Sequence, residues 1–284
     1  MRVLEKFGVC DCHSHVFGPF REYPLSPKRT FDPPEATIEK LENVWKSLGI
    51  DRAVLVQGSA HGNDHAALLA ALAYSPETRR GVALLASDVT ESELSKLHQC
   101  GIRATRFNWI HHLLGSDNRP EEQRLREATA LLERVSPLGW HVEVHIDILD
   151  LDLLTRLRVP DLMPVVIDHM ARLDGTAPNA SDQLAQLLHI LEDDRFWVKV
   201  SGADRLTAKC AELRPASNTI RQILQAAPNR CVWGLDWPHV NLSMRRDDLD
   251  LVNTLLDAAG GETVLERVLI HNPARLYGFT SDVA

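Results

Sequence analysis

Short runs of apolar and β-branched residues alternate along this chain with longer stretches in which apolar residues recur at helical spacing. Residues 37–48 illustrate that spacing, because Ile38, Leu41, Trp45 and Leu48 share one helical face. Eight runs predict strands, at residues 9–15, 53–57, 81–85, 102–108, 140–146, 164–169, 196–201 and 231–237. The intervening stretches predict helices, at residues 37–48, 64–74, 91–100, 121–135, 149–157, 181–191, 216–226, 248–258 and 262–270.

Strict alternation of strands and helices indicates parallel strands joined by right-handed crossovers. Eight such units are the count of a (β/α)8 barrel, whose usual length of about 250 residues is close to the 284 residues of this chain. We therefore predict an α/β protein, a single distorted (β/α)8 TIM barrel that forms one domain over residues 1–284. A doubly wound sheet is the alternative. The proline-rich segment 17–34 is expected to form a long loop after the first strand.

Composition and charge exclude several classes of protein. With 44% hydrophobic and 25% charged residues the chain is an ordinary globular protein, and its net charge of −8 without a basic run argues against a nucleic-acid partner. No apolar run approaches the roughly 18 residues that cross a bilayer, and no signal peptide is evident, so we expect no membrane partner. The five cysteines are odd in number and irregularly spaced, which favours a reduced, cytoplasmic protein. A homo-oligomer stays compatible, because an apolar helix face looks alike in a core and in an interface.

Candidate chemistry begins at the end of the first strand. The carboxyl ends of barrel strands meet at the face that carries the active site. The first strand ends in Asp11-Cys12-His13-Ser14-His15, and residues two apart on a strand share a face. His13 and His15 therefore project together, as two ligands of one metal or two donors to one oxyanion would. The alternative is two unrelated histidines on an edge or in a loop.

Polar residues also mark the fourth and fifth strands. Arg106, near the end of the fourth, could hold a carboxylate through a bidentate pair or form a surface salt bridge. In the fifth strand, alternation puts His141, Glu143 and His145 on one face and valines on the other. The outer face of a barrel packs on helices, so we expect the polar set to point inward with His145 nearest the mouth. A solvated edge strand is the alternative.

The last three strands end in candidates of their own. The sixth ends in Asp168-His169, of which His169 is the catalytic candidate and Asp168 is expected to point the opposite way as a structural residue. Arg205, just beyond the seventh strand, could reach over the mouth or lie on the surface at a helix start. Asp236 closes the apolar eighth strand and is the candidate general base or fourth metal ligand. His239 is expected in the loop beyond it.

These positions and several longer motifs resemble the amidohydrolase superfamily. The motifs include Cys-His-Ser-His-Val-Phe-Gly-Pro, Val-Gln-Gly-Ser-Ala-His-Gly-Asn-Asp, Gly-Trp-His-Val-Glu-Val-His, Val-Ile-Asp-His-Met, Trp-Gly-Leu-Asp-Trp-Pro-His and the terminal Asn-Pro-Ala-Arg-Leu-Tyr-Gly-Phe. They run through nearly the whole chain in order. They are similar to the amidohydrolase-2 type branch that contains 2-pyrone-4,6-dicarboxylate lactonase and sugar-acid lactonases.

The resemblance implies a hydrolase that opens a small carboxylated lactone in aromatic or sugar-acid catabolism. It implies that Asp236 activates water, while His13, His15 and His169 polarise the lactone carbonyl and hold the oxyanion. The substrate-binding candidates that it suggests are Arg106, Arg205, Ser59, His61 and His112.

The chain departs from the pyrone dicarboxylate enzyme at three places. Residues 109–112 replace a second arginine after the fourth strand, His145 replaces a tyrosine, and Phe31 stands for a further tyrosine in the first loop. Without the second arginine, this chain has one fewer cationic side chain for the substrate than the pyrone dicarboxylate enzyme. This difference favours a substrate with a single carboxylate, or a smaller or more hydroxylated lactone.

The resemblance also indicates how many metal ions the site could hold. Many superfamily members bridge two metals with a carboxylated lysine on the fourth strand, and neither the fourth nor the fifth strand here contains lysine, which disfavours a binuclear site. The reaction then needs either no cofactor or a single divalent metal, with Zn²⁺ the best match to the ligand types. The ligands of that metal would be His13, His15, His145 and Asp236. A zinc-dependent decarboxylase, a lactone isomerase and a non-catalytic binding barrel are the alternative functions.

Overall fold

The computed structural model describes residues 4, 8–114, 119–207, 212–242 and 245–280. Its strands form one parallel sheet in chain order from β1 to β8. Their bounds are Cys10–Ser14, Arg52–Val56, Arg79–Ala83, Ile102–Asn108, His141–His145, Val165–Ile167, Phe196–Ser201 and Cys231–Gly234. The first and last strands meet beyond β8, where the backbone N–H of Asp236 donates to the carbonyl of His13 at 2.7 Å. The sheet thus closes into the predicted (β/α)8 barrel, and the doubly wound alternative is wrong.

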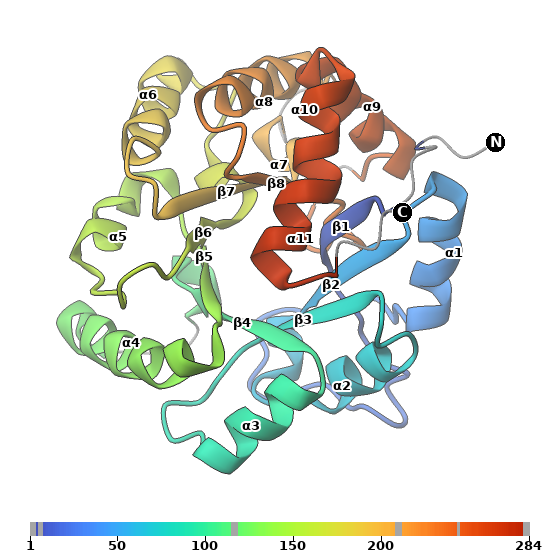
Figure 1. Ribbon diagram of the computed structural model, residues 1–284, viewed down its shortest axis with the longest axis vertical. Coiled ribbons are helices and arrows are strands. Elements are labelled where there is room, and N and C mark those ends of the chain that lie inside the picture. Colours follow the sequence, from blue (N-terminus) through green and yellow to red (C-terminus); the bar gives the residue numbers. More distant parts are fainter. Residues whose placement is uncertain (1–3, 5–7, 115–118, 208–211, 243–244, 281–284) are drawn as a thin grey trace.

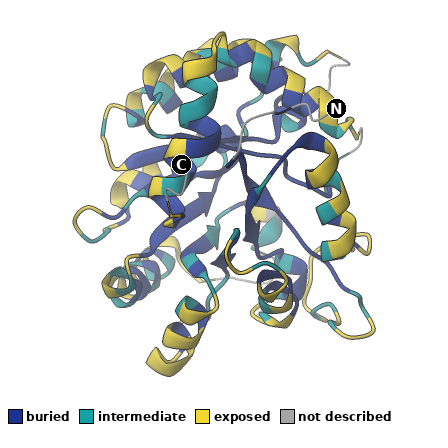
Figure 2. Ribbon diagram, turned by 45° about the vertical axis from the view of Figure 1, so that its right-hand side comes forward, coloured by how far each residue is buried: buried dark blue, intermediate teal, exposed yellow. Residues whose placement is uncertain are grey.

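Helices surround the barrel, with buried strands at the centre and exposed residues on the outer helix faces (Figures 1 and 2). The outer helices are α1 (Ile38–Leu48), α2 (Ala66–Ala73), α3 (Glu91–Gln99), α4 (Glu121–Val135), α5 (Asp152–Arg156), α6 (Ala180–Ile190), α8 (Arg214–Ala226) and α9 (Asp248–Ala259). Local chemistry fixes their ends: the Thr90 side chain accepts from the Glu93 backbone and Glu93 accepts in return, which starts α3 with a capping box. None of the helices in the described ranges is long and apolar enough to cross a membrane.

The C-terminal helices cover one end of the barrel. In Figure 1 the red helices α10 (Glu262–Glu266) and α11 (Asn272–Tyr277) lie across the strands. Leu276, Tyr277 and Phe279 join the inward-facing residues Cys10 and Cys12 in one buried cluster. The interior is therefore packed at this end, which leaves the opposite, carboxyl end of the strands for ligands.

Several elements differ from the prediction in their bounds. The helix predicted at 262–270 continues through a wide turn, η6 (Arg267–His271), into α11, because Pro273 stands in the first turn of α11, where its missing N–H costs no hydrogen bond. The eighth strand ends at Gly234 rather than at 237, and a short helix α7 (Ala203–Leu206) that the periodicity did not indicate follows β7.

Candidate active site

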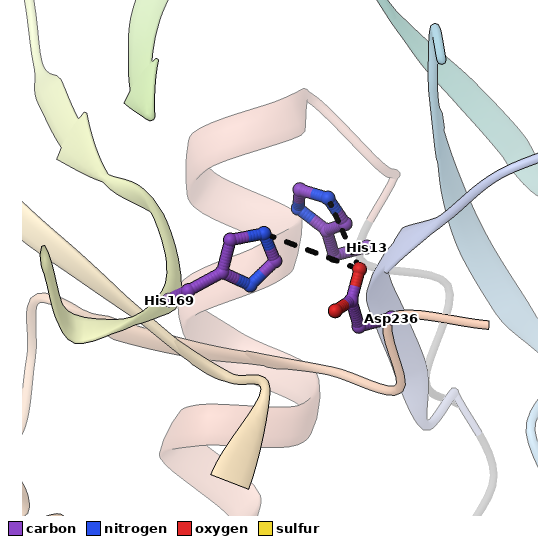
Figure 3. Close-up of side chains that lie close together, drawn as sticks. All are labelled: His13, His169 and Asp236. Carbon is purple, nitrogen blue, oxygen red and sulfur yellow. Dashed lines mark ion pairs between the residues drawn. The ribbon is translucent and has the colours of Figure 1, made fainter. Parts of the chain in front are cut away.

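One carboxylate oxygen lies among three imidazoles at the carboxyl end of the barrel. The Oδ1 atom of Asp236 is 3.6 Å from Nε2 of His15, 3.9 Å from that of His13 and 4.0 Å from that of His169. Figure 3 shows His13, on β1, and His169, just beyond the end of β6, both pointing toward Asp236. All four side chains are buried, and Asp236 Oδ1 has no hydrogen-bond partner among the described residues. Side chains at or just beyond the carboxyl ends of β1, β6 and β8 thus converge on one point, as the strand-end reasoning expected.

A close approach of β1 and β8 places His13 against Asp236. A Cβ atom at Gly234 would lie 2.4 Å from Cβ of His13, so only glycine allows the two strands to come this near. Asp11 ties them together, because its Oδ1 accepts from the backbone N–H groups of His13 at 3.0 Å and Leu235 at 2.9 Å. The sequence analysis did not select Asp11 as a structural residue. The available signal was an acidic residue placed inside an otherwise apolar strand.

A left-handed turn carries His169. In η5 (Asp168–Arg172) the φ angles of the four residues from His169 to Arg172 lie between 50° and 53°, although none of them is glycine. Such turns are strained for L-residues, and side chains three apart in a 3₁₀ turn project alike. His169 and Arg172 therefore both line the cavity above Asp236. The position of Arg172 in the cavity wall was not predicted, because residue types alone do not indicate a left-handed turn.

Burial favours the neutral form of His13, His145 and His169. Burial, followed by the charge of Lys199, lowers the pKa of His13 to about 3. Burial likewise lowers the pKa of His169 and of His145 well below the ordinary value. His15 Nδ1 lies 2.7 Å from the carbonyl oxygen of Val56, which can only accept, so that nitrogen carries the proton. In its neutral form His15 consequently presents a lone pair on Nε2 to Asp236.

Asp236 is ionised despite its burial. Arg205 donates to Oδ2 from Nε at 2.8 Å and from Nη2 at 2.6 Å. Burial by itself raises the pKa of Asp236, but its polar surroundings, first among them the guanidinium of Arg205, outweigh burial and hold this pKa well below its usual range. Arg205 is therefore oriented toward the carboxylate and over the mouth, and the surface alternative for it is wrong.

A buried charge network lies directly beneath these residues. Asp168 was expected to point the opposite way, but its carboxylate lies inside the barrel, 2.7 Å from Nε of Arg106, 3.3 Å from Nζ of Lys199 and 3.6 Å from Nδ1 of His13. The prediction failed because β6 ends at Ile167, so the strand alternation does not reach Asp168. The surface alternative for Arg106 is also wrong, since its side chain is buried.

The polar face of β5 points inward, as predicted. His141, Glu143 and His145 are buried, and β5 pairs with β4 on one side and β6 on the other, so it is not an edge strand. Glu143 accepts from Lys199 at 2.6 Å and from the Tyr277 hydroxyl at 2.7 Å. His145 is nearest the mouth and packs on His169 with ring centroids 5.0 Å apart.

Above Asp236 lies a cavity of about 120 Å³. Ser59 and Phe31 line it, whereas His61 lies behind its wall and stacks on Phe17. His239 bonds Asp248 at 2.7 Å and does not line this cavity. The side chain of His112 lies outside the described part of the structure.

Three of the converging residues could hold a metal ion. One ligand atom each from His13, His169 and Asp236 lies within 4.8 Å of the other two. The His13 nitrogens and Asp236 Oδ1 have no hydrogen-bond partners in the described residues, and nitrogen and oxygen donors suit Zn²⁺. His15 borders this group, but His145 of the expected ligand set is not part of it. A second group, formed by His13, Glu143 and Asp168, already faces the ammonium of Lys199.

Comparisons with known proteins agree on one family. The family model described as amidohydrolase matches residues 10–279. A 2-pyrone-4,6-dicarboxylate hydrolase of Comamonas testosteroni is 34% identical over 95% of this chain and 90% of its own length. A 4-sulfomuconolactone hydrolase of Hydrogenophaga intermedia is 31% identical over 98% of this chain and 91% of its own.

A solved structure from Pseudomonas putida, described as a 2-pyrone-4,6-dicarboxylic acid hydrolase, superposes with a TM-score of 0.83 at 28% identity. The match covers 98% of this chain and 100% of that one. Because sequence and structure agree over nearly the full length, this chain belongs to the amidohydrolase family.

Proposed function

We propose that this protein hydrolyses the ring ester of a small anionic lactone. The observation that carries the proposal is the ionised, buried Asp236, whose Oδ1 has no hydrogen-bond partner among the described residues and faces three imidazoles under a cavity. Two relatives are named as hydrolases of a pyrone and a muconolactone, both of which are cyclic esters. A base, carbonyl-directed donors and cationic side chains are the parts that this reaction needs.

Asp236 is the general base. Arg205 holds Oδ2, which leaves Oδ1 to accept a proton from water. His15, whose Nδ1 faces the Val56 carbonyl, accepts on Nε2 a hydrogen bond from the other O–H of the water, and so orients the nucleophile. The water oxygen bonds to the lactone carbonyl carbon as its proton passes to Asp236. The ring C–O bond then breaks, and the leaving oxygen takes that proton.

His169 is the donor to the developing oxyanion. Its Nδ1 lies 2.9 Å from the Ser201 hydroxyl, which can donate to it and thereby leave the proton on Nε2, on the side of Asp236. His13 faces Asp168 through Nδ1 and the reaction point through Nε2. Loss of one oxyanion donor typically reduces the rate by about 10²–10³-fold.

Cations on the cavity wall bind the anionic group of the substrate. Arg106 donates from Nε to Asp168, which fixes the plane of the guanidinium. Its two terminal nitrogens have no hydrogen bond to any of the described residues and can bind a ligand carboxylate. Arg172 lines the same cavity and uses Nε on Asp147 at 3.0 Å. Arg205 is already bonded to Asp236, so we assign carboxylate recognition to Arg106 and Arg172.

A single divalent metal would be held by His13, His169 and Asp236. When bound, such an ion supplies Lewis-acid polarisation of the carbonyl and lowers the pKa of a coordinated water. The residue roles given above for Arg106, Arg172 and Arg205 are the same with or without it.

The test is proton release from a panel of carboxylated lactones at neutral pH, covering pyrone, muconolactone and aldonolactone rings, with and without chelator. We expect turnover by the wild type, loss of at least about 10³-fold in Asp236→Asn, and no change in Asp88→Asn, an exposed matched control. A rearranged lactone without proton release would instead identify an isomerase. Carbon dioxide as the product, with stoichiometric metal, would refute the proposal in favour of a decarboxylase.

A further inference from the structure

Three arginine side chains line the cavity over Asp236, and each has its Nε beside a carboxylate oxygen. The pairs are Arg106 with Asp168 at 2.7 Å, Arg205 with Asp236 at 2.8 Å and Arg172 with Asp147 at 3.0 Å. Each cation of the cavity wall therefore has one anion that offsets its charge. How strongly the wall attracts an anionic substrate depends on these partners as much as on the arginines.

The Arg172–Asp147 pair differs from the other two in its exposure. Its side chains are 30% and 37% exposed, whereas the carboxylates of the other two pairs are buried. Asp147 lies just beyond the end of β5, and Arg172 belongs to the left-handed turn after β6, so the pair joins two loops at the mouth of the barrel. Because both side chains reach water, neutralising Asp147 strands no buried charge and changes the electrostatics of the cavity rather than the fold.

The carboxylate of Asp147 faces Arg172 and has no capping role. It makes no capping hydrogen bond at the start of η4 (Ile148–Asp150). Burial lowers the pKa of Arg172, and Asp147 is the first group that raises it again. Arg205 and Asp236 follow with opposite effects, and they pair with each other. Asp147 is therefore the anion that offsets the charge of Arg172.

A second carboxylate on the substrate would meet this pair. Arg106 can hold one carboxylate, which leaves Arg172 as the cation for another. The terminal nitrogens of Arg172 have no hydrogen bond to the described residues, but an anion that approaches them also approaches the negative charge of Asp147. Like charges that share one cation repel each other, so the second carboxylate gains less from Arg172 than the first gains from Arg106.

We propose that Asp147 is a specificity-determining residue, which offsets the charge of Arg172 so that the site favours lactones with one carboxylate over lactones with two. The inference rests on the proposed function and specifies its substrate class. Asp147 touches no reacting atom and acts through Arg172.

The size of the effect follows from one charge in a partly solvated site. Asp147→Asn keeps a side-chain oxygen that can accept from Nε of Arg172 and removes only the negative charge. A unit charge at this exposure changes the binding of a neighbouring ion by about fivefold. We therefore expect kcat/KM for a dicarboxylated lactone, divided by kcat/KM for its monocarboxylated analogue, to rise about fivefold in Asp147→Asn.

The experiment measures this ratio on pairs of lactones that share one ring and differ by a single carboxylate. The matched control is Asp152→Asn, which removes the same charge from an exposed aspartate at the start of α5, 3.9 Å from Arg156, and should keep the wild-type ratio. In the Arg172→Gln background, Asp147→Asn should no longer change the ratio, because Asp147 acts through that guanidinium.

A binding measurement gives a second readout that needs no turnover. Isophthalate and benzoate are ring acids with two carboxylates and one, and calorimetry yields the affinity of the protein for each. We expect the isophthalate-to-benzoate affinity ratio to rise in Asp147→Asn and to stay unchanged in Asp152→Asn.

The outcomes separate the two proposals. An unchanged or lower ratio in Asp147→Asn overturns the specificity inference and leaves lactone hydrolysis intact. A rise that persists in the Arg172→Gln background, or that Asp152→Asn reproduces, overturns it as well, since net charge alone would then explain the change. Absence of turnover on every lactone overturns the proposed function, while the affinity ratio still decides whether Asp147 selects against a second carboxylate.

Discussion

Replacing Lys199 with methionine tests whether the buried charge network holds the barrel interior together. Lys199 is fully buried and contacts Glu143 at 2.6 Å and Asp168 at 3.3 Å. Methionine keeps most of the stem volume and removes the ammonium. Asp168 then retains Arg106, whereas Glu143 is left with the Tyr277 hydroxyl and the nearby carboxylate of Asp168.

The magnitude follows from the carboxylate left behind. Removing one partner of a buried ion pair costs about 3–5 kcal/mol, because the remaining charge stays desolvated. Burial raises the pKa of Glu143, but Lys199 and then His141 outweigh it, so the pKa is lowered in the wild type. A lowered carboxyl pKa adds stability above the unfolded-state pKa, and that stability is lost as the pH falls through the folded-state value. We expect Lys199→Met to cost about 4 kcal/mol at pH 7 and less near pH 4.

The assay is urea unfolding followed by tryptophan fluorescence at both pH values. The exposed Lys46→Met is the matched control and should change the free energy of unfolding by less than about 0.5 kcal/mol. Glu143→Gln should rescue Lys199→Met, so that the double variant is more stable than the sum of the single losses by about 2 kcal/mol. Additive losses, or a cost below about 1 kcal/mol for Lys199→Met, would refute the reasoning.

Three further predictions concern local structure. Gly234→Ala brings a Cβ atom within 2.7 Å of the His13 backbone nitrogen, so we expect a loss of about 3 kcal/mol in urea unfolding and of lactone turnover; wild-type values would contradict the close approach. Ala171→Gly relieves a left-handed residue with φ of 52° and should leave unfolding free energy unchanged or raise it by up to about 1 kcal/mol, whereas a clear loss would show that the turn is not strained. Burial raises the pKa of Cys231 to about 12, so at pH 8 a thiol reagent should label the exposed Cys100 and spare Cys231, as peptide mass spectrometry can measure; equal labelling would count against this burial.

The local sequence pattern was sufficient to predict the fold and the position of part of the candidate site. Alternation of β-rich and helical stretches predicted every barrel strand, since periodicities of two and of about 3.6 residues are read from neighbours in sequence. The same alternation turned His141, Glu143 and His145 inward, and the ends of apolar runs marked His169 and Asp236. These features need no knowledge of distant residues.

Only the tertiary structure decided which partners these side chains have. The pairing of Arg205 with Asp236, and of Lys199 with Glu143 and Asp168, depends on barrel closure between strands far apart in the chain. The direction of Asp168 and the placement of Arg172 depend on a left-handed turn of non-glycine residues, which surrounding packing imposes against local preference. The sequence alone therefore determined the barrel and the strands on which its candidate residues lie. The structure decided which of these residues meet, because ion pairing and backbone strain are set by neighbours in space.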